Sequence, residues 1–231
     1  MFLTPYIYES NISSNQAKIL IILPDIFGLN KGNKQMIDDF SSQTGFKTFG
    51  LDYFYQITNT ATNLDFNSAQ KAVELMNGFK GEDFVLIFDK ALDAILSKFP
   101  NPEKIAVCGF CFGGRLSLLS ALNQKINSVI SFYGAGVHKP DFYNEKSLAQ
   151  ILEENPEITK SKDFLLFFGD LDQSIPLVEI NMTQNLLNSQ SKSYDQVIYA
   201  NANHAFFNKE RSSFVPEIYD EIVDKIKNFL N

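Results

Sequence analysis

The feature that most constrains the fold of this chain is a regular alternation along its length. Short apolar runs of strand length alternate with longer segments in which apolar residues recur with a helical period. Runs such as IAVCGF at residues 105–110 and FLLFF at 164–168 are apolar throughout, as strands covered on both faces should be. The pattern predicts an α/β fold with a mostly parallel central sheet and helices on both faces. The predicted strands lie at residues 18–23, 47–51, 104–108, 128–132, 164–168 and 196–199, and the predicted helices at 34–43, 67–77, 84–98, 113–123, 146–154, 177–189 and 215–230.

Length and composition favour one folded domain. The chain has 231 residues, of which 45% are hydrophobic and 20% charged, so apolar material for a core is ample. No internal repeat, low-complexity tract or linker divides it, and α/β folds of this length commonly form one unit. We therefore expect residues 1–231 to form a single α/β domain.

Charge and hydropathy argue against two classes of partner. Twenty basic and 27 acidic side chains give a formal net charge of −7, which disfavours a phosphate-binding surface and hence nucleic acid. The longest apolar run, residues 19–23, is far shorter than the roughly 20 residues that span a membrane. The first ten residues lack the basic start of a secretory signal. We expect a cytoplasmic protein with no membrane or nucleic-acid partner, and the sequence does not indicate its oligomeric state.

The stretch GFCFGG at residues 109–114 predicts a nucleophile elbow. It joins a predicted strand to a predicted helix, and glycines flank Cys111 as a sharp strand-to-helix turn requires. The unpaired N–H groups at the start of that helix would face the sulfur and favour the thiolate, which is the reactive form. Cys111 is therefore expected to be a nucleophile.

The same stretch permits a redox interpretation, since Cys108 and Cys111 form a CxxC pair. Cys108, however, ends an apolar strand-like run, where a free cysteine usually packs as a small hydrophobic residue. A third interpretation is that both cysteines are buried and inert and that the glycines only allow close helix packing.

A thiolate nucleophile usually needs a histidine that holds its proton and later delivers it to a leaving group. The chain has two histidines. His204 follows the predicted strand at 196–199, where a loop at the carboxyl end of the sheet is expected, whereas His138 lies in the irregular segment GAGVHKP. His204 is the better match for the catalytic base.

A carboxylate after an intervening strand should orient this histidine. The segment FLLFFGDLDQSIP offers Asp170 and Asp172, and the local pattern does not choose between them. Either residue could instead cap a turn. The order cysteine, aspartate, histidine is that of an α/β-hydrolase triad.

An oxyanion also needs donors, typically the N–H after the nucleophile and one from an early loop. Phe112 supplies the first, and Ile26 in the loop LPDIFGLN can supply the second. Asp25 beside it could raise the pKa of a neighbouring thiol, or could merely cap the following helix.

These residues are where the chain resembles the dienelactone hydrolase family of α/β-hydrolases, through LPDIFGLN, LDYFY, GFCFGG, SFYG, GDLDQSIP and NANHAFFN in the family's order. The resemblance implies Cys111 as nucleophile, His204 as base and Asp172 as the acid, with Ile26 and Phe112 as oxyanion donors.

The sequence also departs from this family in two ways. Family members commonly carry glutamate where Asp25 stands, and Asn208 replaces an arginine that binds a substrate carboxylate in the founding enzymes. A chlorinated dienelactone is therefore not the expected substrate, and Arg115 is expected to be structural.

The predicted function is hydrolysis of small esters or lactones through a thioester intermediate, without cofactor or metal. The alternatives are a thiol-disulfide oxidoreductase that uses Cys108 and Cys111, and a non-catalytic binding protein of the same fold.

Overall fold

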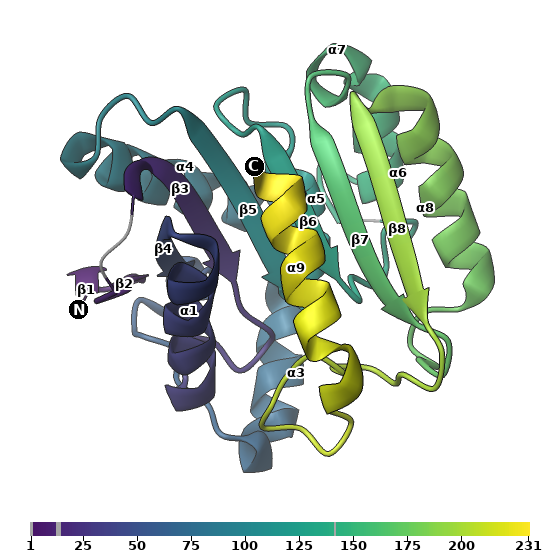
Figure 1. Ribbon diagram of the computed structural model, residues 1–231, viewed down its shortest axis with the longest axis horizontal. Coiled ribbons are helices and arrows are strands. Elements are labelled where there is room, and N and C mark those ends of the chain that lie inside the picture. The colour runs from purple at the N-terminus through teal and green to yellow at the C-terminus, as the bar shows by residue number, and fades with distance from the viewer. Residues whose placement is uncertain (1, 13–14, 141) are drawn as a thin grey trace.

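The computed structural model describes residues 2–12, 15–140 and 142–231, and within them eight strands form one sheet (Figure 1). In spatial order the strands are β1 (Phe2–Thr4), β2 (Ile7–Glu9), β4 (Phe46–Leu51), β3 (Asn15–Leu23), β5 (Lys104–Phe110), β6 (Ser128–Phe132), β7 (Asp163–Gly169) and β8 (Ser193–Tyr199). The six strands from β4 to β8 run parallel, so their carboxyl ends meet at one edge of the sheet. The predicted mostly parallel sheet is confirmed.

Two short strands at the amino-terminal end were not predicted. Strands β1 and β2 pair antiparallel with each other, and β2 pairs antiparallel with β4. Each spans three residues, which is too short for an apolar period to be recognised in the sequence.

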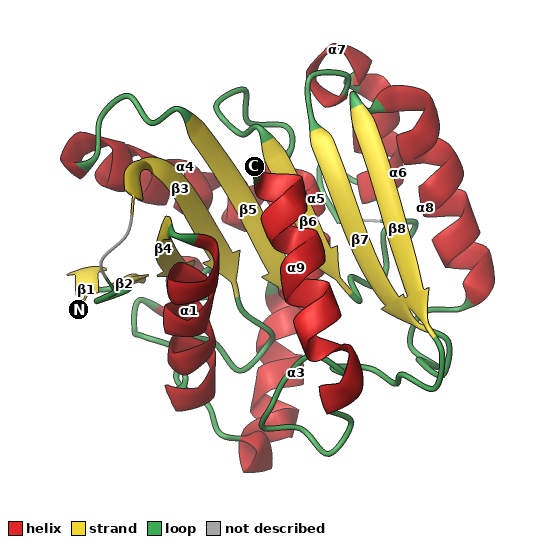
Figure 2. Cartoon of the chain, viewed as in Figure 1, coloured by secondary structure: helices red, strands yellow, loops and turns green. Residues whose placement is uncertain are grey.

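Helices cover both faces of the sheet, as predicted (Figure 2). One face carries α1 (Lys31–Thr44) and α9 (Tyr219–Leu230), which pack against each other. On the other face lie four helices, each of which packs against the next: α4 (Gly81–Lys98), α5 (Phe112–Ser120), α6 (Leu148–Glu154) and α8 (Leu177–Gln190). The remaining helical segments are α2 (Tyr55–Thr58), α3 (Ala69–Gly78), α7 (Pro156–Thr159) and the short η1 (Phe66–Ser68) and η2 (Pro216–Ile218).

The core is strongly aromatic at the carboxyl edge of the sheet. The ring of Phe132 stacks on Phe110 at 4.7 Å and on Phe167 at 4.6 Å between centroids, and Phe207 lies 4.8 Å from it. All four rings are at most 3% exposed. Strands β5, β6 and β7 thus share a rigid apolar layer with the loop that follows β8.

The long connection between β6 and β7 contains α6 and α7, and the predicted helix at residues 146–154 corresponds to α6. Ser147 caps α6 by accepting from the backbone N–H of Gln150, whose side chain accepts in return from the N–H of Ser147. Within this connection Asp141 lies outside the described residues.

Lys162 joins the start of β7 to the loop after α5. Its side chain is buried, and Nζ donates to the carbonyls of Asn123 at 3.2 Å, Gln124 at 3.2 Å and Ile126 at 2.5 Å. We expect Lys162→Met to lower the free energy of unfolding by about 2–4 kcal/mol, because charge-assisted hydrogen bonds are lost and buried carbonyls are left unpaired. Urea denaturation checks this, with exposed Lys160→Met as the control that should leave stability unchanged. A loss below about 0.5 kcal/mol in Lys162→Met would contradict the assignment.

Candidate active site

Cys111 occupies a sharp turn between β5 and α5. Its backbone dihedrals are φ 57° and ψ −120°, a left-handed conformation that L residues rarely adopt. Its N–H donates to the carbonyl of Phe132 at 3.0 Å, which holds the turn against β6. The turn therefore places the sulfur by backbone geometry at the carboxyl edge of the sheet.

The glycines around Cys111 are required by close backbone approach. A Cβ at Gly109 would lie 1.9 Å from the carbonyl oxygen of Gly113, and a Cβ at Gly113 would lie 2.2 Å from that of Leu23. Any larger residue would force the start of α5 away from β3 and β5.

The two cysteines lie in different surroundings, and both are free. Cys108 is fully buried in β5, and burial raises the pKa of its thiol well above the ordinary value. Cys111 is half-buried and lines a cavity. Only Cys111 is available to a small molecule.

The structure brings His204 and Asp172 together. His204 Nδ1 lies 2.6 Å from Asp172 Oδ2, and the side chain of Asp172 is 1% exposed. The other oxygen of Asp172 accepts from the N–H of Ser174 at 2.9 Å, which fixes the carboxylate. Asp170, in contrast, is exposed. Of the two aspartates after β7, Asp172 is the one that orients His204.

Two neighbours also set the protonation of His204. Burial disfavours the charged imidazolium, but hydrogen bonds to Asp172 and Cys111 and the charges of these two groups raise the pKa of His204 from 6.5 to about 10. The imidazole thus lies between a carboxylate and the thiol. His138 is not part of this group, since its Nε2 lies 3.3 Å from Thr183 Oγ1 on α8.

The loop that carries His204 is held by residues that the sequence pattern did not indicate. Ser213 Oγ donates to the carbonyl of His204 at 2.6 Å, and the ring of Tyr133 lies 5.0 Å from the imidazole. The following residue, Ala205, has φ 64°, so the chain turns sharply after His204.

Ile26 and Phe112 lie at the same cavity as Cys111. Both line the cavity that Cys111 and His204 also line. Within the described part of the chain neither backbone N–H has a protein acceptor. Both donors therefore remain available to a ligand oxygen.

Asp25 is turned into its own loop. Its Oδ1 accepts from the N–H of Phe27 at 3.1 Å and from Asn33 Nδ2 at 3.0 Å, and no hydrogen bond joins it to Cys111 among the described residues. Burial raises the pKa of the Asp25 carboxyl, against the lowering effect of these two hydrogen bonds.

The cavity at Cys111 has a volume of about 420 Å³. Its described lining includes three cationic residues, Lys80, Arg115 and Lys139, and no aspartate or glutamate. Arg115, expected to be structural, is 8% exposed, and its guanidinium carbon lies 3.7 Å from the ring centroid of Phe142. Sequence reasoning did not assign these three residues to the site, because they belong to separate segments.

Two features typical of other classes of protein are missing from the described residues. No group of three or more His, Cys, Asp or Glu side chains is arranged to hold a metal ion among them. None of the helices in the same residues is both long and apolar enough to cross a membrane.

Comparison with known proteins agrees with this geometry. The family model described as "Dienelactone hydrolase family" matches residues 3–231. The chain belongs to the dienelactone hydrolase family. It is thus a hydrolase, and the α/β-hydrolase fold predicted for it is confirmed.

Individual relatives are distant but match over most of their length. The carboxymethylenebutenolidase homolog of Xenopus tropicalis is 26% identical over 96% of this chain and 84% of its own. Among solved structures, the dienelactone hydrolase-like promiscuous phosphotriesterase P91 from metagenomic libraries has a TM-score of 0.70 at 15% identity, covering 97% of this chain and 98% of its own. A thermophilic esterase of Thermogutta terrifontis, Est2 with bound propionate, has a TM-score of 0.64 at 15% identity, covering 97% and 87%.

Proposed function

We propose that the chain hydrolyses small esters or lactones with Cys111 as nucleophile, His204 as base and Asp172 as the acid of the triad. The observation that carries this proposal is the position of His204. Its Nδ1 lies 2.6 Å from Asp172, and its interaction with Cys111 raises the same imidazole's pKa. A cavity opens directly onto the sulfur and the imidazole. These are the parts that acyl transfer to a thiol requires.

In the first half-reaction the thiolate of Cys111 attacks the carbonyl carbon of the ester, and the carbonyl oxygen becomes an oxyanion. The N–H groups of Ile26 and Phe112 stabilise that charge. The intermediate collapses as the C–O bond breaks, and the imidazolium of His204 gives its proton to the leaving alkoxide. The acid part of the substrate is then held as a thioester.

In the second half-reaction water replaces the alcohol. Neutral His204 takes a proton from the water, whose oxygen attacks the thioester carbon and forms a second oxyanion in the same site. The C–S bond breaks, the carboxylic acid leaves, and the thiolate–imidazolium pair is restored. Asp172 keeps the imidazole in one tautomer and orientation throughout.

Acyl-enzyme capture tests this proposal. The protein is mixed with p-nitrophenyl acetate, quenched in acid within milliseconds to seconds, and analysed by intact mass and peptide mapping. We expect one acetyl group, located on Cys111. Acetylation spread over lysines, with none on Cys111, would refute the nucleophile.

The oxidoreductase alternative has less support. Cys108 is fully buried in β5 with a raised thiol pKa, whereas a CxxC pair needs an accessible thiolate. A binding protein without catalysis would have no need of the His204–Asp172 contact. We retain as predictions a single domain over residues 1–231, a cytoplasmic location, no nucleic-acid partner and, for Asp25, an influence on the thiol of Cys111.

The lining of the cavity favours substrates that carry a second, anionic group. The Nε and Nη2 atoms of Arg115 are buried and have no hydrogen-bond partner among the described residues. Burial lowers the pKa of Arg115 to about 10, against the raising effect of the Glu179 charge, so the guanidinium is still charged at neutral pH. Lys80 and Lys139 line the same cavity.

We expect Arg115→Met to raise KM about tenfold or more for a monoester of succinic acid, because a charged hydrogen bond contributes about 1.5–3 kcal/mol. The KM for a neutral ester of the same length should stay within twofold. Steady-state kinetics on both esters checks this, with exposed Lys125→Met as the control for net charge. Equal changes in KM for the two esters would contradict the charge preference.

A further inference from the structure

The loop that carries Ile26 forms a tight turn that two internal hydrogen bonds close. The N–H of Gly28 donates to the carbonyl of Asp25 at 3.1 Å, and the N–H of Phe27 donates to the carboxylate of the same aspartate at 3.1 Å. Among the described residues the N–H of Ile26 has no protein acceptor, so it remains free to donate to a ligand. Its direction is therefore set by whatever fixes the turn.

Asn33 on α1 contacts this turn at two points. Its Nδ2 donates to Asp25 Oδ1 at 3.0 Å and to the carbonyl of Gly28 at 2.8 Å. The residue is 3% exposed, and a buried amide is costly unless its donors are satisfied. The amide thus clasps the turn, in the sense that it donates one hydrogen bond to each of its two ends, Asp25 and Gly28.

Tyr53 holds the turn from another side. Its hydroxyl lies 3.0 Å from the carbonyls of both Pro24 and Asp25, and the residue is 1% exposed. The hydroxyl proton is shared between these two acceptors. The turn is therefore tied to α1 through Asn33 and to the segment after β4 through Tyr53.

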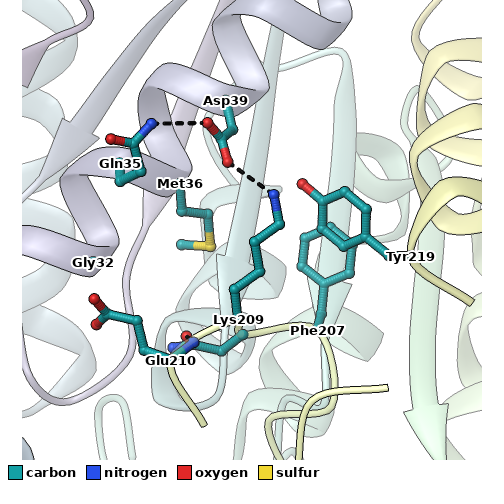
Figure 3. A pocket seen from close by; sticks show the side chains of 9 residues that line it. Gly32, Gln35, Met36, Asp39, Phe207, Lys209, Glu210 and Tyr219 are labelled. Atoms are coloured by element: carbon teal, nitrogen blue, oxygen red, sulfur yellow. Dashed lines mark hydrogen bonds and ion pairs between the residues drawn. The ribbon is translucent and has the colours of Figure 1, made fainter. Parts of the chain in front are cut away.

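Helix α1 is in turn joined, at Gly32 and Asp39, to the loop after His204 (Figure 3). Glu210 packs so closely on Gly32 that a Cβ there would lie 1.9 Å from Oε2. Lys209 Nζ lies 3.1 Å from Asp39 Oδ2 and 4.2 Å from the ring centroid of Tyr219 on α9. Asn33 thus projects from a helix that also contacts the segment following the catalytic histidine.

We propose that Asn33 is a positioning residue: its side-chain amide clasps the Asp25 carboxylate and the Gly28 carbonyl, so that the N–H of Ile26 stays aimed at the oxyanion. This inference rests on the proposed function for its kinetic consequence. It also gives Asp25 a second role, because the carboxylate that Asn33 holds is an anchor of the turn.

The kinetic test is Asn33→Leu, which keeps the number and branching of the side-chain heavy atoms and removes both donors. We expect kcat on p-nitrophenyl acetate to fall about 10- to 100-fold, since a displaced oxyanion donor loses much of its effect. KM should stay within threefold because the donor acts on the transition state. Exposed Gln35→Leu on the same helix makes the same amide-to-apolar change and should keep full kcat. Tyr53→Phe, which removes only the hydroxyl, should lower kcat in the same direction.

Two readouts separate this role from general loss of structure or of thiol reactivity. The rate of Cys111 alkylation by iodoacetamide against pH should be the same in Asn33→Leu and wild type, because alkylation forms no oxyanion. Hydrogen exchange at the amides of Phe27 and Gly28 should become faster in Asn33→Leu, while exchange in β5 should not.

The outcomes distinguish the two proposals. Unchanged kcat in Asn33→Leu, with Cys111-dependent hydrolysis intact in wild type, overturns the positioning role alone. Unchanged exchange at Phe27 and Gly28 also overturns it, whether or not the protein hydrolyses esters. A shift of the alkylation profile equal to the loss in kcat would assign Asn33 to thiol activation and overturn its positioning role. Absence of any Cys111-dependent hydrolysis in wild type overturns the proposed function, and the exchange result then decides the positioning role.

Discussion

Cys111→Ala is expected to lower kcat for p-nitrophenyl acetate by about 10⁴-fold or more, since removing a nucleophile leaves only what the oxyanion donors and substrate binding provide. The change removes one sulfur from a half-buried position and should leave the fold intact. Stopped-flow or steady-state release of p-nitrophenol measures the effect. The acetyl-enzyme seen by mass in wild type should disappear as well.

Cys108→Ala is the matched control for this variant. Cys108 lies three residues earlier in β5, fully buried within the sheet, and contributes no atom to the cavity lining that is described. The control should hydrolyse the same ester at a rate within twofold of wild type. If the two alanine variants lost activity equally, a paired role for the cysteines would replace the triad. If Cys111→Ala kept activity, the nucleophile would have to be sought elsewhere.

The second large effect is expected from Asp172→Asn. The amide no longer carries the charge that holds the Nδ1–H tautomer of His204, and loss of this contact in triads lowers kcat by about 10³- to 10⁴-fold. Burial lowers the pKa of His204, but hydrogen bonds and charges from Asp172 and Cys111 raise it to about 10 in the wild type. Without the contribution of Asp172, His204 in the variant should titrate at a lower pH. The chain has two histidines, so an NMR titration of the imidazole protons resolves this shift.

Asp170→Asn provides the control for that change. Asp170 follows the same strand, but its side chain is exposed and has no contact with the imidazole in the described structure. The kcat of Asp170→Asn and the pKa of His204 in this variant should match those of the wild type. A comparable loss in both variants would indicate a general electrostatic effect on the site, and an unshifted His204 in Asp172→Asn would contradict the proposed pairing.

Much of the scaffold was predictable from the sequence because parallel strands covered on both faces are apolar throughout. Strand β6 was predicted with the bounds it has, and β3 and β5 were predicted within a few residues of theirs. The helix α5 was predicted to end three residues late, since apolar spacing continues after Ser120 into turns that the pattern cannot distinguish from helix.

The parts of the site that chain order and local sequence context identify could be predicted from the sequence. The glycines around Cys111 indicated the elbow because close backbone approach leaves no room for a side chain. The choice between Asp170 and Asp172 was different, since both follow β7 and only their side-chain directions separate them. Asn33 could not be predicted at all. In a helical pattern it is an ordinary polar position, and its burial comes from packing against the turn at Asp25.

The dihedral angles at Cys111 have a consequence for the range of chemistry that this scaffold can support. The backbone dihedral angles at Cys111 place the reactive group, and they do not depend on which atom ends the side chain. The same turn could present an oxygen close to the position of the sulfur. The backbone therefore fixes the location of the reactive group, and the acidity, size and polarizability of its terminal atom distinguish a thiol enzyme from an alcohol one.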